Sequence, residues 1–249
     1  MRAFFFWTRW PVPLVSHLDL LDQMGHRYLF HFTLTGLGPP LESQRPTIQE
    51  RIDAFRTLSD RIGHDRVWWR YDPIILGDRL DADYHRSRFD SLSKALEGAT
   101  SRVTLSLLDW YRKTERRVKP LEDRAGSLKR LEGPEPEAME LVTRLVQMAR
   151  SRGMTPVACC QPAFHEVGVE PGACIDAAAA NRIFGLEVQD EKDKGQREKC
   201  CCAPSFDIGA AHTCISGCAY CYSTVSQEVA LRNFGRHDPT GEFLHNLIP

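Results

Sequence analysis

Short apolar runs alternate with longer amphipathic stretches along the first 185 residues of the chain. The apolar runs, rich in aromatic and β-branched residues, are typical of buried strands and occupy residues 3–8, 28–34, 67–76, 103–108 and 155–159. Apolar residues recur at helical spacing over residues 14–23, 47–63, 81–96, 133–152 and 175–185. Strands that alternate with helices in this way predict a parallel sheet in an α/β fold.

Local signals predict where some of these elements end. Thr47 and Glu50 form a capping-box pattern at the start of one helix, and Gly63 is suited to end it. Pro73 has no backbone N–H to donate, so we expect it at the end of its strand or outside the ladder. Gly185 is expected to end the last of the five helices.

The number of strand–helix units limits the architecture. Five or six units are too few for a closed eight-stranded barrel, so we expect an open or partial (β/α) barrel. Its functional groups would gather at the carboxyl ends of the strands. We expect residues 1–190 to form this scaffold and residues 191–249 to form a cysteine-rich segment with a closing helix, packed together as one compact unit.

Composition and charge exclude several classes of protein. Hydrophobic residues make up 42% of the 249 residues and charged residues 26%, the balance of a globular protein. The formal net charge of -1 gives no general attraction for a polyanion. No apolar run approaches the ~18 residues that span a bilayer, and the N-terminal stretch lacks signal-peptide features. We therefore expect a cytoplasmic protein with no membrane partner.

All nine cysteines lie between Cys159 and Cys221, and an odd number in tight clusters suits metal ligation better than disulfides. The sharpest cluster is HTCISGCAYCYS, in which Cys214, Cys218 and Cys221 are spaced C-x3-C-x2-C. Thiolates select zinc, copper(I) or iron–sulfur clusters. A [4Fe–4S] cluster normally takes one cysteine per iron, so three cysteines would leave one iron open.

A structural zinc site is the alternative interpretation of these three cysteines, with His212 or another cysteine as the fourth ligand. Structural zinc sites usually have paired C-x2-C knuckles, and only Cys218 and Cys221 form one in this stretch. The spacing therefore favours an iron–sulfur cluster. Gly217 supplies the backbone freedom that a loop needs to turn around a cluster.

Several of the remaining cysteines suggest a second site. The segment REKCCCAPS has three adjacent thiols, and in an extended backbone Cys200 and Cys202 point to one face while Cys201 points to the other. Cys160 and Cys174 would supply two further ligands for a four-cysteine site. In the alternative interpretation, Cys159, Cys160 and Cys174 are small buried hydrophobic residues, a common role of free cysteine.

The C-x3-C-x2-C spacing with an aromatic residue before the last cysteine resembles the motif of the radical S-adenosylmethionine superfamily. It is most similar to members written C-x3-C-x-Y-C-Y, such as spore photoproduct lyase and its relatives. The resemblance implies a [4Fe–4S] cluster on Cys214, Cys218 and Cys221, with S-adenosylmethionine on the open iron and Tyr220 beside the cofactor. It also implies reductive cleavage to a 5′-deoxyadenosyl radical and an electron donor such as flavodoxin or ferredoxin.

A longer series of segments strengthens the resemblance and occurs in the order FWTRWP, FHFTLTG, RVWWRYDPIIL, DWYRKTERRV, GACIDA, KDKGQREKCCCAPSFDIGAAHTCISGCAYCY and RHDP. Together these segments resemble an uncharacterised bacterial family, a domain of unknown function grouped with spore-photoproduct-lyase-like radical S-adenosylmethionine proteins. The resemblance implies that Cys160 (or Cys159), Cys174, Cys200 and Cys202 form a second metal site. A second iron–sulfur cluster there would relay electrons or hold substrate.

The chain departs from this pattern in the order and presence of some segments. Most radical enzymes of this kind have the cluster loop after the first strand, whereas here it follows SFDIGA near the C-terminus, as expected of a circularly permuted barrel. The family usually has a strand–helix unit with a Ser-Arg-Arg-Thr-Asp-type motif before FWT, and here Met1 almost adjoins FWT. Trp10 stands where the family commonly has Asn. If the missing motif binds cofactor or substrate, we expect impaired activity.

Two further stretches contain candidate binding residues. Arg70 in WWRYDP suits the carboxylate of S-adenosylmethionine, since a guanidinium binds a carboxylate through two parallel hydrogen bonds. The alternative is a structural pair between Arg70 and Asp72 at a strand end. Residues 112–130 have eight Lys or Arg against three acids, which suits either nucleic acid or a solvated loop.

From these residues we predict a radical S-adenosylmethionine enzyme with an unidentified substrate. Two alternatives belong to other classes of protein. One is a non-catalytic zinc protein with a structural or nucleic-acid-binding role. The other is an iron–sulfur electron carrier or sensor without radical chemistry.

Overall fold

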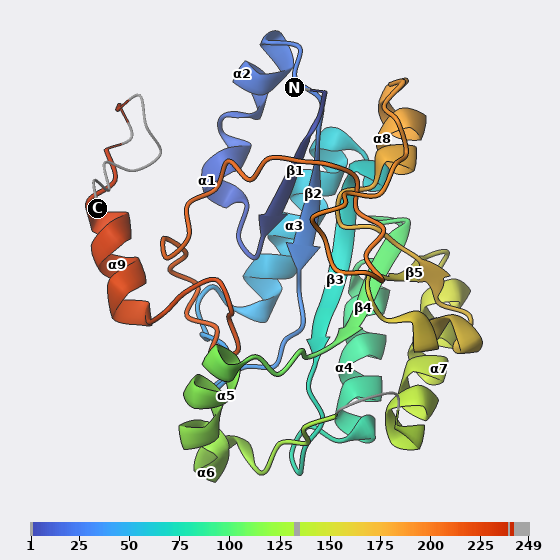
Figure 1. Cartoon of the computed structure of the whole chain (residues 1–249), viewed down its shortest axis with the longest axis vertical. Helices are drawn as coiled ribbons and strands as arrows, with labels where there is room; N and C mark the ends of the chain where they lie inside the picture. The colour runs from blue at the N-terminus through green and yellow to red at the C-terminus, as the bar shows by residue number, and fades with distance from the viewer. Residues whose placement is uncertain (1, 132–134, 239, 242–249) are drawn as a thin grey trace. The chain divides into compact units, whose positions relative to one another are not determined.

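The computed structural model describes residues 2–131, 135–238 and 240–241 (Figure 1). The chain packs as two units. The sheet unit consists of Met1–Gly36, Pro46–Leu108 and Leu128–Ser205, and the loop unit consists of Leu37–Arg45, Asp109–Ser127 and Phe206–Pro249. The domain boundary expected at residue 190 lies within the sheet unit.

Six parallel strands form one sheet in the sheet unit, and their spatial order is the same as their order in the chain. The strands are β1 (Phe4–Thr8), β2 (Tyr28–Thr33), β3 (Val67–Ile74), β4 (Arg102–Leu107), β5 (Thr155–Ala158) and β6 (Glu170–Pro171). Among the described residues β1 and β6 remain the two edges, so the sheet is open and not closed into a barrel. The predicted α/β fold with a parallel sheet is therefore confirmed.

One face of the sheet carries the main hydrophobic core. Tyr28, Phe30 and Phe32 alternate along β2 onto this face and are fully buried, as the period of two along a strand requires. The helices that contribute apolar residues to this core include α3 (Ile48–Ile62), α4 (Ala82–Ala95) and α7 (Pro136–Ser151). The predicted start of α7 at residue 133 lies outside the described residues.

The opposite face of the sheet is partly polar. Leu29 and Trp68 form a small apolar cluster with Ala179 of helix α8 (Ala177–Phe184). His31 and Arg70 alternate with the core residues of β2 and β3 and therefore project toward this second face. A parallel sheet is usually apolar on both faces, so these polar positions mark where a site is built.

The predicted helix ends agree with the structure where caps are visible. Thr47 and Glu50 form the capping box of α3, and Gly63 follows its last residue. Pro73 lies next to the end of β3, where the register shifts between Tyr71 and Ile74, so its missing N–H interrupts no regular ladder. Gly185 ends α8 in the left-handed conformation.

The remaining elements are short. The stretch predicted as one helix over residues 14–23 forms two, α1 (Val12–Val15) and α2 (Leu18–Gln23). The 3-10 helices are η1 (His64–Arg66), η2 (Lys119–Leu121) and η3 (Pro162–Val167). In the loop unit the helices are α5 (Arg112–Val118), α6 (Glu122–Ala125) and α9 (Gln227–Gly235). The basic stretch at residues 112–130 is therefore largely helical.

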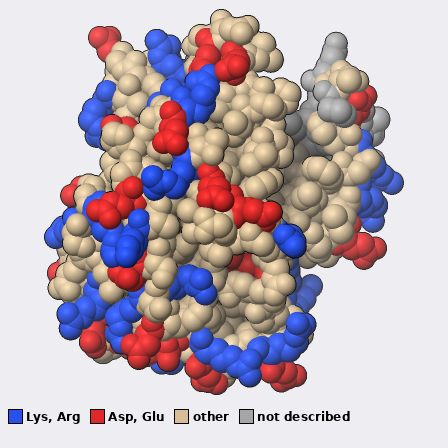
Figure 2. Space-filling model, turned by 180° about the vertical axis from the view of Figure 1, so that it is seen from behind, with Lys and Arg blue, Asp and Glu red and all other residues tan. Residues whose placement is uncertain are grey.

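The surface carries both signs of charge. Figure 2 shows Lys and Arg side chains interspersed with Asp and Glu over parts of one face, with uncharged residues between them, as expected from a formal net charge of -1. In the part of the chain that the structure describes, no helix combines the length and apolar character that crossing a membrane requires.

Candidate metal centre

Five cysteine side chains converge in the sheet unit. Cys159 and Cys160 follow the end of β5, Cys174 follows β6, and Cys200 and Cys202 lie on the irregular segment after α8. The ligand atoms form two overlapping groups, one of Cys159, Cys174 and Cys202 and the other of Cys159, Cys160 and Cys200. Within each group all sulfur atoms lie within 4.8 Å of one another.

The fold explains how three of these thiols meet. Parallel neighbours β5 and β6 end at the same edge of the sheet, so the residues that follow them lie close together. Cys160 has a positive φ of 58°, which is uncommon for a residue other than glycine and turns the chain directly after the strand. The carboxyl end of a strand was the expected location of functional groups, and the five-cysteine site lies at such an end.

Backbone N–H groups support the thiols of the irregular segment. The N–H of Cys174 donates to the Sγ of Cys202 at 3.2 Å, and the N–H of Cys202 donates to the Sγ of Cys200 at 3.4 Å. Cys200 and Cys202 are buried, whereas Cys201 between them is exposed and belongs to neither group. A hydrogen bond donated to sulfur stabilises the negative charge of a thiolate ligand when a metal is bound.

Arg70 and His31 hold Cys174 from the polar face of the sheet. Arg70 donates to the Sγ of Cys174 at 3.4 Å and pairs with Asp72. His31 donates from Nε2 to the carbonyl oxygen of Cys174 at 2.8 Å and stacks on Trp7 with ring centroids 4.8 Å apart. Burial, together with the charge of Arg70, lowers the pKa of His31 to about 3, so the imidazole is neutral.

The thiols of the five-cysteine site differ in pKa. The pKa of Cys174 lies well below its ordinary value, because the thiols of Cys159 and Cys202 donate hydrogen bonds to it and Arg70 is nearby. The same hydrogen bond to Cys174 raises the pKa of Cys159, which keeps its proton. The thiol of Cys174 therefore gives up its proton more readily than an ordinary cysteine, and metal binding would release protons from the ligands that keep theirs.

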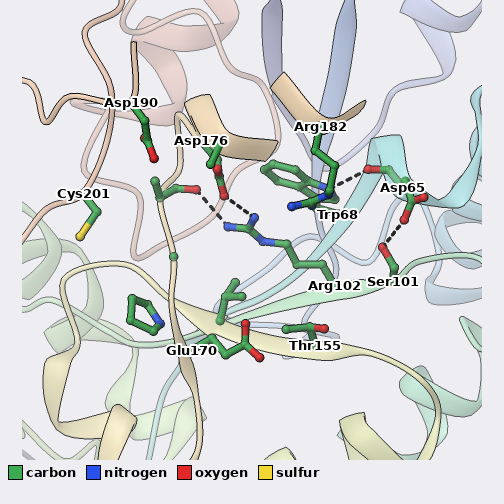
Figure 3. A pocket seen from close by; sticks show the side chains of 15 residues that line it. Asp65, Trp68, Ser101, Arg102, Thr155, Glu170, Asp176, Arg182, Asp190 and Cys201 are labelled. Atoms are coloured by element: carbon green, nitrogen blue, oxygen red, sulfur yellow. Dashed lines mark hydrogen bonds and ion pairs between the residues drawn. The ribbon is translucent and has the colours of Figure 1, made fainter. Parts of the chain in front are cut away.

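Arg102 fixes the loop that carries Cys174. It pairs with Asp176 at 2.6 Å, donates to the carbonyl oxygen of Ala173 at 3.1 Å, and lies 4.0 Å above the Trp68 ring. These groups line a cavity of about 490 Å³, and Cys201 lies on its wall (Figure 3). Asp176 also caps α8, so one carboxylate fixes both the helix start and the cysteine loop.

The geometry of the five thiols fits a metal. Two sulfur ligands of one tetrahedral zinc ion, with Zn–S bonds of about 2.3 Å, lie about 3.8 Å apart. The Sγ of Cys159 lies 3.9 Å from that of Cys160 and 4.0 Å from that of Cys200. Soft thiolates at this spacing could bind a metal ion or a cluster. The cysteine set that the sequence suggests is thus brought together, and both Cys159 and Cys160 take part.

The other three cysteines lie in the loop unit, on a stretch without helix or strand before α9. Cys218 is buried, Cys221 is half-buried and Cys214 is exposed. Gly217 has a φ of +71°, so the backbone turns between the first two cysteines. The described residues do not gather these three thiols into a group with the close spacing of the five-cysteine site. A cluster that takes each cysteine on a different iron does not require that spacing.

Arg117 of α5 contacts the backbone of this loop. Its guanidinium donates to the carbonyl oxygens of Cys218 at 2.8 Å, Cys221 at 2.9 Å and Thr224 at 2.9 Å. The N–H of Cys221 also donates to the carbonyl oxygen of Cys218 at 3.3 Å, which closes a turn. Arg117 therefore fixes the backbone around two of the three cysteines.

Tyr220 and His212 are held by neighbours within the loop unit. Tyr220 is buried, its hydroxyl donates to the Glu42 carboxylate, and its carbonyl oxygen accepts from Thr114 at 3.3 Å. His212 accepts a hydrogen bond at Nδ1 from the N–H of Val225 at 3.1 Å. The zinc interpretation of His212 would therefore have to use Nε2.

The sequence did not identify His31, Glu42, Arg102 or Arg117 as functional residues. His31 had one usable signal, because it stands between Phe30 and Phe32 in an otherwise apolar strand. Arg117 was one basic residue among many in its stretch, and nothing local distinguishes it from its neighbours.

The fold and the cysteine site together define an α/β protein with a candidate thiolate metal centre. A family model described as "Domain of unknown function (DUF1848)" matches residues 1–223, and the chain belongs to this family. No curated protein sequence matches the chain.

A solved structure from Anabaena variabilis ATCC 29413, described as a candidate sugar phosphate isomerase/epimerase, resembles part of the chain at 11% identity. The alignment covers 64% of this chain and 54% of that one, so it spans about half the length of the solved protein. The TM-score is 0.36, which is too low to assign a shared fold or activity.

Proposed function

We propose that this protein is a radical S-adenosylmethionine iron–sulfur protein in which Cys214, Cys218 and Cys221 hold a [4Fe–4S] cluster. The observation that carries the proposal is the irregular loop with all three thiols, whose backbone is fixed by Arg117. When bound, the cluster and S-adenosylmethionine would supply a 5′-deoxyadenosyl radical that abstracts hydrogen from a substrate.

The residues around the loop have roles that follow from their contacts. Arg117 holds the carbonyl oxygens of Cys218 and Cys221, which fixes the backbone from which both thiols project. Tyr220 is fixed by Glu42, so the aromatic ring before the last cysteine is held in one position.

Arg70 and Asp72 have a role at the five-cysteine site that accounts for their contacts. Arg70 donates to the thiol of Cys174 and pairs with Asp72, all within the sheet unit. Their assignment to the carboxylate of S-adenosylmethionine stays a prediction. The proposal for Cys214, Cys218 and Cys221 does not depend on which metal the five-cysteine site binds.

The proposed architecture is a partial barrel whose cluster loop has moved to the end of the chain. Six sequential parallel strands in an open sheet support the first part of this proposal. The position of the cysteine loop after the sixth strand supports the circular permutation. A small protein electron donor of the flavodoxin or ferredoxin type would provide the reducing electron in the cell.

The second candidate function is a non-catalytic zinc or iron–sulfur protein with a structural or electron-transfer role. The spacing of 3.9 Å and 4.0 Å from Cys159 to its two nearest thiols favours it, because this is the spacing of ligands on one ion. A nucleic-acid role has less support, since the basic stretch forms a helix whose Arg117 is used within the protein.

The deciding experiment uses full-length protein purified and reconstituted without oxygen. Iron, sulfide and zinc are counted, the protein is reduced with dithionite, and 5′-deoxyadenosine is measured after addition of S-adenosylmethionine. We expect deoxyadenosine in the wild type and in the Cys201→Ser control, and its loss in Cys218→Ala. Zinc without iron uptake, or iron without deoxyadenosine, would refute the radical assignment and leave the second candidate.

A further inference from the structure

Cys159 belongs to both groups of close thiols in the sheet unit. One group adds Cys174 and Cys202, and the other adds Cys160 and Cys200. No group of close ligands in the described part of the chain contains all five thiols. The thiols therefore form two overlapping groups that share the sulfur atom of Cys159.

We propose that the five-cysteine site binds two thiophilic metal ions, such as zinc, with the Cys159 thiolate as the bridging ligand. One ion is bound by Cys159, Cys174 and Cys202, and the other by Cys159, Cys160 and Cys200. A water molecule completes each tetrahedron, as at zinc sites with three protein ligands. This differs from the second iron–sulfur cluster that the sequence predicts, and it does not depend on the proposed radical chemistry.

Sulfur spacing is the first argument for single ions. A [4Fe–4S] cluster binds each cysteine through a different iron, so two cysteine sulfurs are separated by two Fe–S bonds and an edge of the cluster. Two sulfurs on one ion are separated by about 3.8 Å. The distances from the Cys159 sulfur to those of Cys160 and Cys200, 3.9 Å and 4.0 Å, fit the single ion.

Charge is the second argument. Five thiolates carry five negative charges, and two divalent ions neutralise four of them. One divalent ion would leave either three negative charges close together or several thiols protonated and unused. The nearby Arg70 and Asp72 form a pair that is neutral as a whole, so the pair does not offset the excess negative charge of the thiolates. A buried excess of negative charge is costly, which favours the second ion.

Both groups of thiols receive a hydrogen bond from the backbone. The acceptor is the Sγ of Cys202 in the first group and the Sγ of Cys200 in the second. Hydrogen bonds donated to the ligand atoms of a metal site are typical, because they orient those ligands. Cys201 stands between these two residues in sequence but lies on the wall of the cavity in Figure 3, outside both groups. It is therefore a matched control for removal of a thiol.

The test uses the full-length chain with Cys214, Cys218 and Cys221 changed to Ala, which removes the loop thiols. The metal-free protein is titrated with Zn²⁺ without oxygen, and bound zinc is counted after desalting. We expect two zinc ions per chain in this parent and in its Cys201→Ser derivative. Cys160→Ser and Cys174→Ser each remove a ligand from one centre only, so each should lower the count to one. Cys159→Ser should lower the count to one or none.

A second measurement needs no cysteine variant. In the wild-type chain loaded with ¹¹³Cd²⁺, a bridging thiolate gives scalar coupling between two cadmium resonances. Coupled resonances support the shared ligand. The proposal would be overturned if the parent bound one zinc ion per chain, or if Cys159→Ser retained two. It would also be overturned if the site bound four irons and four sulfides in preference to zinc, or if the cadmium resonances were uncoupled. The radical reaction is measured separately as 5′-deoxyadenosine, so its absence would not change the expected zinc count or cadmium coupling.

Discussion

The guanidinium of Arg117 donates a hydrogen bond of 2.8 Å to the backbone carbonyl oxygen of Cys218, 101 residues further along the chain. It makes two similar bonds to Cys221 and Thr224. Irregular loops have few internal hydrogen bonds, so their carbonyl groups depend on partners from elsewhere. One side chain from α5 therefore satisfies three carbonyl groups of the cysteine loop.

Replacement of Arg117 should loosen this loop and weaken its metal site. Arg117→Ala leaves partly buried carbonyl groups without these donors, at a cost of about 1–3 kcal/mol each where water cannot replace the bond. We expect reconstituted Arg117→Ala to retain less iron on Cys214, Cys218 and Cys221 and to produce at least tenfold less 5′-deoxyadenosine. Arg117→Lys can still make some of these hydrogen bonds, so its iron content and deoxyadenosine yield should lie between those of the wild type and Arg117→Ala.

The matched control for Arg117 is its exposed neighbour Arg116, which has the same charge and lies on the same helix. Arg116→Ala should behave as the wild type in iron content and deoxyadenosine yield. Equal losses in Arg116→Ala and Arg117→Ala would show that positive charge on α5 matters and that the carbonyl contacts do not.

Tyr220 and Glu42 should stabilise the loop unit as a pair. The hydroxyl of Tyr220 donates to the Glu42 carboxylate, and both side chains are buried. Tyr220→Phe removes the donor and should lower the free energy of unfolding by about 1–3 kcal/mol. The loss should be much smaller when Glu42 is already Gln, so a double-mutant cycle measured by denaturant unfolding gives the coupling. Additive losses would contradict a direct interaction.

Much of the sheet could be predicted from the sequence because its physical signals are local. Alternating apolar residues in YLFHFT set which side chains enter the core, and the Thr47–Glu50 capping box set the start of α3. The strand β6 was missed because two residues are too short to show any period. Without β6, nothing in the sequence shows why Cys174 reaches Cys159.

The candidate sites were predictable only in part for a related reason. Cysteine spacing is visible in a sequence, so the loop motif and the second cysteine set were recognised. The shared position of Cys159 depends on three segments meeting, and sequence left Cys159 and Cys160 as alternatives. His31 contacts Cys174 across 143 residues, and Arg117 contacts Cys218 across 101, so no local pattern reports either contact.

Arg70 should control how readily Cys174 ionises in the metal-free protein. Its charge contributes to the lowered pKa of the Cys174 thiol, after the hydrogen bonds from Cys159 and Cys202. Arg70→Met removes that charge and should raise the pKa of Cys174. Thiolate absorbance, followed against pH in the metal-free protein, should then show fewer thiolates at a given pH than in the wild type.

Asp72→Asn is the matched variant, because it removes the partner of Arg70 and keeps the guanidinium beside the thiol. A negative charge near a thiol raises its pKa, so this variant should leave the thiolate count unchanged or raise it. A thiolate count in Arg70→Met equal to that of the wild type would assign the ionisation of Cys174 to the neighbouring thiols alone.

His85 should make the sheet unit less stable as the pH falls below neutral. Burial lowers the pKa of His85 to about 4 from its ordinary value of 6.5, and the ring contacts Tyr71 at Nδ1 and the carbonyl oxygen of Ile75 at Nε2. Below pH 6.5 the unfolded chain takes up a proton on this ring and the folded chain does not, down to about pH 4. The stability associated with the neutral ring is therefore present above pH 6.5 and lost as the pH falls, at up to about 1.4 kcal/mol per pH unit.

Unfolding of wild type and His85→Gln by urea, measured from pH 7.5 to 4.5 in the same metal state, isolates this contribution. Glutamine can donate to the Ile75 carbonyl oxygen but does not titrate, so the stability of the variant should fall less steeply over this range. Carboxylates and His31 titrate in both proteins, and their contribution cancels in the comparison. If the free energy of unfolding fell equally with pH in both proteins, the folded protein would accommodate a charged His85. The buried contacts with Tyr71 and Ile75 would then have to open at low pH.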